Sequence, residues 1–395
     1  MAQNSQDSTV PYPEGDFYGF ETLLSEAEQA VLRRVRNWLA ESVRPIAVDY
    51  WNHAQFPMHL IPEIAELGIV SPVRHRGFSP LLAGLITAEV HRNDASVGTF
   101  LSGHDGLFTG SIELLGSEEQ KATWLPQFYS LEKNGVFAIT EPTAGSDVAR
   151  AMSTTAKRVG DHWILNGVKR WIGNSTFSDY VVVYARDLDD DNVKGFLVDT
   201  TWEGYRAELM HNRIALRSVQ NAEIYLNNVR VPNDYKLAYA NSFRDTNKVL
   251  KSARSVVGWQ SVGLQMATFD IARNYSVSRE QFGRPIASFQ LVQEKISRIL
   301  GNLTSSTAMM LQLANLQSAD AEKNEHSALA KAHVTRMMRE SVALGRELLG
   351  GNGLVTDYEM AKVFSDAEAL YSYEGTYEVN SLVAARSVTG VSAFV

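Results

Sequence analysis

A glutamate near the C-terminus lies in surroundings that could give it acid–base chemistry. Glu374 has tyrosines at positions 371, 373 and 377 around it and Gly375 directly after it. Aromatic neighbours exclude water from a carboxylate and raise its pKa toward neutral pH, as a general base requires. The same short segment is also typical of an exposed glutamate before a Gly-Thr helix start, and taken alone it favours that interpretation.

Three other sets of residues stand out by their type and spacing, although their local patterns alone do not assign a ligand to them. Lys251 and Arg254 are three positions apart, so a helix would place them on nearly the same face. The segment TEPTAGSD (140 to 147) is typical of a polar turn before a strand, and the sequence alone assigns no ligand to it. Trp171 in KRWIG is also typical of an ordinary sheet core. A solvated helix face, a polar turn and a core side chain would explain all three without a ligand.

The composition narrows the chemistry. The 395 residues include no cysteine, which excludes disulfides, thiolate nucleophiles and Cys-ligated metal sites, so redox chemistry would need a bound cofactor. We predict no metal site. The content of 45% hydrophobic and 21% charged residues, without an apolar run long enough to cross a bilayer, predicts a soluble protein without membrane insertion. A net charge of -8 without a basic stripe argues against a nucleic-acid partner.

The N-terminal segment, MAQNSQDSTVPYPEGD, resembles neither a secretory signal nor a transit peptide, so we expect a cytoplasmic location. The chain exceeds the usual size of a single hydrophobic core, which predicts two or three domains. Helical patterns run from about 24 to 132, where Ser25 with Glu28 and Ser117 with Gln120 have capping-box spacing. Helical periodicity returns after 241, with breaks near 283 to 285, 319 to 324 and 350 to 353.

Between about 135 and 237 the pattern changes to short strands. HWILNG, DYVVVYAR, KGFLVDT and AEIYLNNVRVP alternate with turn residues, and the acidic segment 187 to 192 is typical of a solvated hairpin tip. We therefore predict an α+β, mainly α, fold: a helical domain (1–133), a central β domain (134–237) and a helical bundle (238–395). An alternating βαβ series is missing, so a Rossmann fold is not expected.

Four segments in this order resemble the acyl-CoA dehydrogenase family: FAITEPTAGSDVA (137 to 149), KRWIGNS (169 to 175), SREQFGRPIASFQ (278 to 290) and YEGTYE (373 to 378). NSTFSD, ELLGGNG and YEGTYEVNSLVAARSVTG are more similar to the glutaryl-CoA dehydrogenase branch and to plant short-chain acyl-CoA oxidases. The resemblance implies FAD as cofactor and a helical domain, a β domain and a C-terminal four-helix bundle, assembled as a homotetramer.

The resemblance also implies roles for individual residues. Glu374 would be the catalytic base, and its backbone N–H would form half of an oxyanion hole for the thioester oxygen. Some relatives carry the base immediately before an arginine of the helix at 250 to 277, but Ala253 precedes Arg254 here. Glu374 is then the only base that the motifs support. The implied substrate-binding residues are Ser146, Lys251, Arg254, Tyr373 and Gly375.

The implied flavin contacts come from separate segments. Those around the β domain are Phe137, Ile139, Thr140, Gly145, Ser146, Trp171, Ile172 and Gly173. A loop that would reach the FAD of a neighbouring subunit supplies Arg279, Gln281, Phe282 and Gln290, and the wall at the adenosine end supplies Glu347, Gly350 and Gly351. Thr376 and Glu378, just after the base, complete the set.

The chain departs from the family pattern at two positions. Gly173 stands where a Ser or Thr hydroxyl usually bonds flavin N5, which increases the weight of an oxidase. Gly98 aligns with the arginine that pairs with the distal carboxylate of glutaryl-CoA, and a buried carboxylate without a partner is costly. The second departure argues against a glutaryl substrate and against decarboxylation.

We therefore predict FAD-dependent α,β-dehydrogenation of a short-chain acyl-CoA to the trans-2-enoyl-CoA in fatty acid or amino acid catabolism. Glu374 would take the proton, flavin N5 the hydride, and an electron-transfer flavoprotein the electrons. Two alternatives stay open: an oxidase that reduces O2 to H2O2, and a glutaryl-CoA dehydrogenase. A flavin-binding protein without turnover is disfavoured because Glu374, Thr140 and Arg254 are all present, and a nitroalkane oxidase would use Asp as its base.

Overall fold

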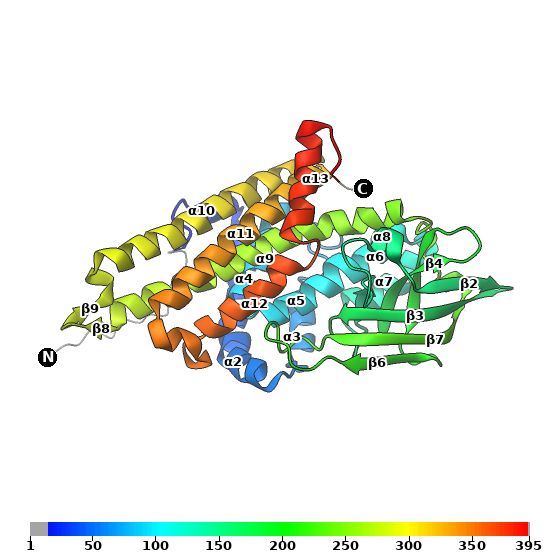
Figure 1. Ribbon diagram of the computed structural model, residues 1–395, viewed down its shortest axis with the longest axis horizontal. Helices are drawn as coiled ribbons and strands as arrows, with labels where there is room; N and C mark the ends of the chain where they lie inside the picture. Colours follow the sequence, from blue (N-terminus) through cyan, green and yellow to red (C-terminus); the bar gives the residue numbers. More distant parts are fainter. Residues whose placement is uncertain (1–14, 394–395) are drawn as a thin grey trace.

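The computed structural model describes residues 15–393, with helices before and after one large sheet. Figure 1 shows an elongated molecule in which a bundle of long helices and the sheet lie at opposite ends. The predicted α+β, mainly α, architecture is confirmed. The domain boundaries at 133 and 237 stay predictions.

The N-terminal part consists of seven helices. They are α1 (Glu26–Trp38), α2 (Arg44–His53), α3 (Leu60–Leu67), α4 (Pro80–Asn93), α5 (Ala95–Ser102), α6 (Gly110–Leu115) and α7 (Glu118–Tyr129). The two predicted capping boxes are confirmed, because Ser25 and Ser117 each accept a hydrogen bond from the backbone N–H three residues later. Two wider π-helical turns, Leu39–Val43 and Gly103–Thr109, were not predicted.

Seven strands and one short helix follow. They are β1 (Gly135–Ala138), α8 (Val148–Ala151), β2 (Thr155–Val159), β3 (His162–Ile172), β4 (Tyr180–Asp187), β5 (Val193–Asp199), β6 (Tyr205–Leu209) and β7 (Ala222–Pro232). The sheet order is β1-β4-β2-β3-β7-β6, with β5 paired to β4. β1 and β2 run parallel to β4 and the other pairs are antiparallel. The sequence patterns did not single out β1, β2 or β6.

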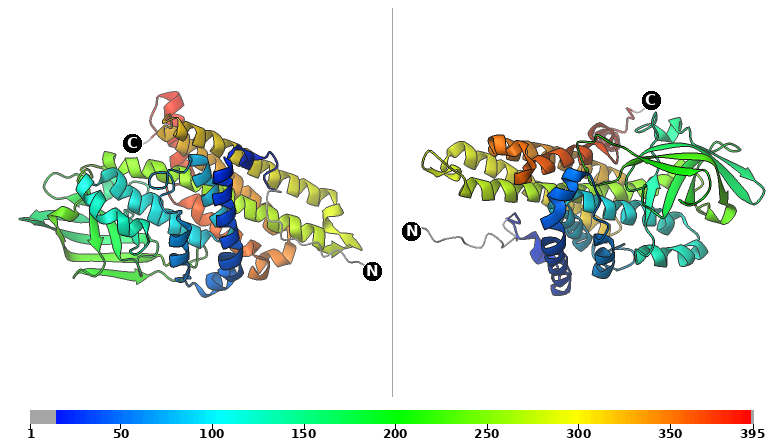
Figure 2. Two further views of the ribbon diagram at one scale, coloured as in Figure 1. Left: turned by 180° about the vertical axis from the view of Figure 1, so that it is seen from behind. Right: turned by 90° about the horizontal axis from the view of Figure 1, so that it is seen from below.

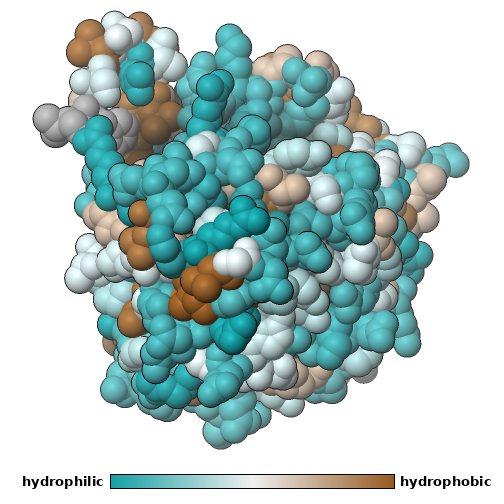
Figure 3. Space-filling model, turned by 90° about the vertical axis from the view of Figure 1, so that its right-hand side faces the viewer, coloured by the Kyte–Doolittle hydropathy of each residue, from teal (hydrophilic) through white to brown (hydrophobic). Residues whose placement is uncertain are grey.

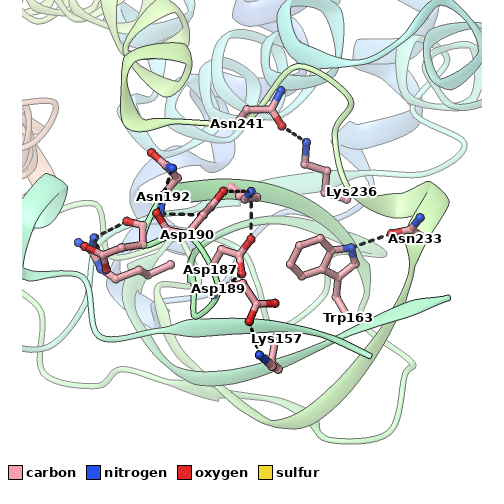
Figure 4. A network of polar contacts seen from close by, with 12 residues as sticks. Lys157, Trp163, Asp187, Asp189, Asp190, Asn192, Asn233, Lys236 and Asn241 are labelled. Atoms are coloured by element: carbon pink, nitrogen blue, oxygen red, sulfur yellow. Dashed lines mark hydrogen bonds and ion pairs between the residues drawn. The ribbon is translucent and has the colours of Figure 1, made fainter. Parts of the chain in front are cut away.

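The acidic segment between β4 and β5 forms the predicted hairpin tip, but one of its carboxylates is buried. Asp187 is 3% exposed and lies 3.0 Å from the Lys194 ammonium, which also contacts Asp190 at 2.6 Å. These acids form part of a polar network around Trp163, whose indole N–H donates to Asn233 at 2.9 Å (Figure 4). The surrounding face of the molecule is largely hydrophilic (Figure 3).

The C-terminal part is a bundle of long helices. It contains α9 (Phe243–Ser278), the hairpin β8 (Glu280–Gln281) and β9 (Arg284–Pro285), α10 (Gln290–Ser318), α11 (Asn324–Leu348), α12 (Met360–Ser372) and α13 (Tyr377–Thr389). The three predicted breaks are confirmed, because they separate these helices. Helices α9, α10 and α11 run side by side along the long axis, and the N-terminal helices cover one side of them (Figures 1 and 2). Among residues 15–393, no helix is both long and apolar enough to span a bilayer.

Candidate active site

Glu374 lies in the short turn between α12 and α13, and its backbone is left-handed. Its φ is 54° and that of Gly375 is 84°. A left-handed residue with a side chain costs about 1–2 kcal/mol and persists where surrounding contacts hold it. The Thr376 hydroxyl caps α13 by accepting from the Val379 N–H at 3.3 Å. The predicted base therefore occupies a strained turn between two helix ends.

Two side chains hold this turn through its carbonyl oxygens. The Asn380 amide donates to the carbonyl oxygens of Gly375 at 2.8 Å and Thr376 at 3.1 Å. The Lys331 ammonium, from α11, donates to those of Tyr371 at 2.9 Å and Gly375 at 2.7 Å. Sequence reasoning missed both. The one sequence feature that could have pointed to Lys331 is its helical spacing from small residues such as Ala328 and Thr335, which are buried with it on α11.

The Glu374 carboxyl is half-buried, and burial raises its pKa above the ordinary value. The positive charges of Arg254 and then Lys331 act in the opposite direction. Burial makes this carboxyl group more basic, while the two positive charges favour its ionised form, and a general base needs both influences.

Arg254 and Lys251 extend from the same side of α9 toward the turn between α10 and α11. Lys251 donates to the Glu322 carbonyl oxygen at 2.8 Å, and Arg254 donates to the Asn324 side chain. The Arg254 Nε is buried and finds no acceptor among the described residues. Burial also lowers the pKa of Arg254, with the Glu374 charge opposing this. An unpaired buried donor near a carboxylate is suited to an oxygen-rich ligand.

Tyr373, directly before the base, is fixed by Gln260, a residue of α9 that was not predicted. Its hydroxyl donates to the Gln260 side-chain oxygen at 2.6 Å, and burial raises its pKa. Tyr373 packs against a hydrophobic cluster that includes Leu216 and Val219, from the segment between β6 and β7. This cluster connects the Glu374 turn to the β domain.

On the β domain, the segments 139–141 and 169–171 are joined by a buried ion pair. The Lys169 ammonium donates to the Glu141 carboxylate at 2.9 Å and to the Ile139 carbonyl oxygen at 3.0 Å, and both side chains are inaccessible to solvent. The backbone N–H of Arg170 donates to the Thr140 carbonyl oxygen at 2.9 Å. The structure therefore brings together two of the segments predicted to contact a flavin.

Trp171 is 55% exposed and has a φ of 65°, so it is not the core residue that the strand pattern alone suggested. Gly145 and Ser146 are also exposed, and a Cβ built on Gly145 would meet no atom within 4 Å. Ile139 and Ile172 are buried, while Phe137, Thr140 and Gly173 are half-buried. An uncovered indole beside open backbone is the kind of surface that a planar aromatic ligand can cover.

The remaining predicted cofactor residues lie at the other end of the bundle. Arg279, Gln281, Phe282 and Gln290 are exposed around the β8–β9 hairpin, and Glu347, Gly350 and Gly351 are exposed at the end of α11. Figure 1 shows this end pointing away from the β domain. Within one chain, these residues are not brought together with Glu374. Phe282 is 93% exposed, which is unusual for so large an apolar side chain.

Glu378 is exposed on the first turn of α13, and Thr376, which caps that helix, is half-buried. Among the residues that the structure describes, no group of three or more His, Asp or Glu side chains is arranged to hold a metal ion. Around Glu374, the structure places the positive charges of Arg254 and Lys331 and the hydrogen-bonding side chains of the turn.

Comparisons with known proteins cover nearly the whole chain. Residues 25–132, 136–229 and 243–389 match the N-terminal, middle and C-terminal domains of acyl-CoA dehydrogenase, respectively. The chain is 30% identical to the human mitochondrial short-chain specific acyl-CoA dehydrogenase over 92% of its own length and 90% of that protein.

Solved structures agree with this. The glutaryl-CoA dehydrogenase of Mycobacterium smegmatis has a TM-score of 0.93 at 31% identity, over 96% of this chain and 99% of that chain. A structure of a glutaryl-CoA dehydrogenase from the same organism in complex with FADH2 gives a TM-score of 0.92 at 30% identity, over 96% and 98% of the two chains.

Proposed function

The chain belongs to the acyl-CoA dehydrogenase family of FAD-dependent oxidoreductases, and we propose that it oxidises a short-chain acyl-CoA to the trans-2-enoyl-CoA. The observation that carries this proposal is the environment of Glu374. Its carboxyl has a raised pKa, sits in a strained turn and faces two cations. This arrangement suits removal of a weakly acidic α proton from a thioester.

The residues of the chain fit a flavin. Trp171 offers an uncovered aromatic face, and the open backbone at Gly145 leaves room for a bulky group beside it. We infer that Ile139, Thr140 and Trp171 hold the ring end of FAD, and that the exposed residues around Phe282 and Gly350 contact the FAD of a neighbouring subunit. When bound, FAD supplies the oxidant that accepts hydride from the β carbon.

In this proposal, the protein residues handle the thioester and the proton. The Glu374 carboxylate takes the α proton, and the backbone N–H of the same residue binds the thioester oxygen as negative charge develops there. Lys251 and Arg254, whose buried Nε has no acceptor within residues 15–393, orient the CoA-bearing substrate. Tyr373, fixed by Gln260, helps to keep water away from the carboxylate. The α proton goes to Glu374 and the β hydride leaves with its electron pair, which gives the enoyl product.

Anaerobic titration of the yellow holoenzyme with acyl-CoAs of graded length tests the proposal. We expect a short-chain acyl-CoA to bleach the flavin of the wild-type protein. Glu374→Gln should retain the flavin but lose bleaching by at least about a thousandfold. A matched control is Glu340→Gln, which removes a glutamate of α11 paired with Arg298, far from the turn. If no thioester bleaches the wild-type flavin, the proposal is wrong.

The electron acceptor can be identified by the same experiment. An electron-transfer flavoprotein is the acceptor that we propose, and an oxidase is the second candidate because of Gly173. That position lacks a hydroxyl group, and a Cβ there would lie 3.1 Å from the Val219 side chain. Rapid return of the yellow colour when air is admitted would favour the oxidase. Persistence of the reduced state in air would favour a protein acceptor.

A glutaryl substrate is disfavoured by the packing at Gly98. A Cβ built there would lie 2.4 Å from the His91 ring, which is itself 1% exposed. The site of the expected arginine is therefore filled by another side chain, and burial lowers the pKa of His91 to about 4, which leaves the ring uncharged at neutral pH. We propose a substrate without a distal carboxylate, and a homotetramer as the assembly.

A further inference from the structure

Lys331 is a buried cation that takes no part in the proposed proton and hydride transfer. It is 0% exposed and lies in α11 among buried positions that include Ala328, Ala332 and Thr335. Burying an ammonium group is costly unless hydrogen bonds and opposite charges compensate it. An apolar residue of similar length would fill the same volume without that cost, so the charge has to be explained by what it contacts.

Its two hydrogen bonds bracket the base. The Lys331 ammonium donates to the carbonyl oxygen of Tyr371 at 2.9 Å, three residues before Glu374, and to that of Gly375 at 2.7 Å, one residue after it. Tyr371 belongs to the last turn of α12, whereas Gly375 belongs to the turn that precedes α13. One nitrogen atom therefore fixes the distance between the two sides of the segment that carries the base.

This segment needs external support. Glu374 and Gly375 are consecutive left-handed residues, with φ of 54° and 84°. Without contacts to hold them, the glutamate would relax toward a right-handed or extended conformation and its carboxyl would move. The Asn380 amide supports the C-terminal side, through Gly375 and Thr376. Of these two side chains, Lys331 alone also reaches α12.

The charge of Lys331 faces three ionisable side chains from the neighbouring elements. They are Glu374 in the turn, Glu378 on α13 and Arg254 on α9. Burial lowers the pKa of Lys331 to about 8, while the two carboxylates oppose this shift and Arg254 adds to it. The side chain is therefore cationic at neutral pH and becomes neutral in mildly alkaline solution.

We propose that Lys331 is a positioning residue for the base: its ammonium group holds the left-handed turn through the two carbonyl oxygens and stabilises the ionised form of Glu374. The inference rests on the proposed function, since it takes Glu374 as the proton acceptor. Lys331 itself exchanges no proton with the substrate.

Lys331→Met, which keeps the length of the side chain and removes its charge and both hydrogen bonds, tests the geometric part. Amide hydrogen exchange of the full-length holoenzyme, measured by mass spectrometry, should be at least about tenfold faster for the peptide 371–378 than in the wild type. Peptides from α10 should not change. This measurement needs no turnover, so it also decides the geometric part if the proposed function fails.

The rate of flavin reduction by acyl-CoA, measured anaerobically across pH, tests the electrostatic part. Loss of the positive charge makes Glu374 harder to ionise, so we expect a rate about tenfold lower at pH 6. The gap from the wild type should narrow above about pH 8, where Lys331 is neutral in the wild type. Lys331→Arg should keep the wild-type dependence of the flavin-reduction rate on pH below neutral. If Lys331→Met does not fold, Lys331→Gln removes the charge while keeping a donor.

Lys362→Met is the matched control, because it removes another buried ammonium, one that contacts Asp94 at 3.0 Å and Asp366 at 3.2 Å. Lys362→Met should lower the stability of the protein without changing how the flavin-reduction rate depends on pH below neutral. Failure of acyl-CoA to bleach the wild type would refute the proposed function alone. If the wild type is bleached but Lys331→Met loses rate equally at every pH, or shows unchanged exchange at 371–378, the inference about Lys331 is overturned.

Discussion

The buried pair of Glu141 and Lys169 should contribute measurably to stability, and Glu141→Gln is the direct test. Glu141 is 2% exposed and also accepts from the backbone N–H groups of Ser153 at 2.6 Å and Thr154 at 2.8 Å. Burial alone would raise its pKa, but the Lys169 charge and these hydrogen bonds outweigh burial and lower it from 4.5 to about 2. At about 1.4 kcal/mol for each unit of pKa, this corresponds to about 3 kcal/mol at neutral pH.

The glutamine keeps the shape of the side chain but leaves the Lys169 ammonium buried without its counter-ion, a change that typically costs about 3–5 kcal/mol. An unfolding entropy of about 2.1 cal/mol/K per residue converts 3 kcal/mol into a decrease in Tm of about 4 °C for a chain of this size. Thermal unfolding followed by circular dichroism at pH 7 measures it. Asp189→Asn, which breaks a half-exposed pair with Lys157, should change Tm by less than about 1 °C.

The contribution of the Glu141–Lys169 pair to stability should decrease as the pH falls. The folded-state pKa of Glu141 lies below the unfolded value of 4.5, so its contribution is fully present above about pH 4.5 and is lost as the pH falls toward about 2. The difference in Tm between wild type and Glu141→Gln should therefore shrink below pH 4.5. A decrease smaller than about 1 °C at pH 7, or a difference that stays constant into acid, would refute the reasoning.

Two further predictions concern packing and assembly. Gly98→Ala should destabilise the protein by about 1–3 kcal/mol because its Cβ would lie 2.4 Å from the His91 ring; denaturant unfolding should show a smaller cost when His91→Ala is already present, and equal costs in both backgrounds would contradict the contact. Phe282→Ser should shift the protein toward smaller oligomers in analytical ultracentrifugation with an unchanged circular dichroism spectrum, because a 93% exposed aromatic side chain is typical of a subunit contact; an unchanged sedimentation coefficient would argue against that contact.

The elements that could be predicted from the sequence are those with long, locally encoded patterns. The helix starts at Ser25 and Ser117 depend on side chains three residues apart, and β3, β4, β5 and β7 have seven or more residues each. β1, β2 and β6 have only four or five residues, and the π-helical turn at Gly103–Thr109 has no signal that differs from an ordinary helix. These features are determined by packing against distant segments, which local patterns do not contain.

The candidate site also contains residues that a local pattern predicts and residues that only the folded chain brings together. Glu374 could be singled out because its motif is contiguous, but the residues that support it come from elsewhere in the chain. Lys331 contacts carbonyl oxygens 40 and 44 positions away, and Gln260 contacts Tyr373 across 113 positions. The strand pattern around Trp171 alone predicts an ordinary core residue, and the flavin contact is implied only by the family resemblance. Its exposure in the folded chain agrees with a ligand contact and not with a place in the core.

The two departures from the family pattern acquire a different meaning once their neighbours are known. From the sequence, Gly173 and Gly98 each appear as the loss of a polar side chain. In the structure, the space beside each glycine is occupied, by Val219 at 3.1 Å from a built Cβ at Gly173 and by His91 at 2.4 Å at Gly98. At Gly98 a larger side chain would collide with the buried His91 ring, so an arginine there requires His91 to move, whereas at Gly173 a side chain makes only a tight contact with Val219. We therefore expect a change of substrate specificity at Gly98 to require a paired substitution at His91, whose uncharged ring offers no positive charge to a distal carboxylate.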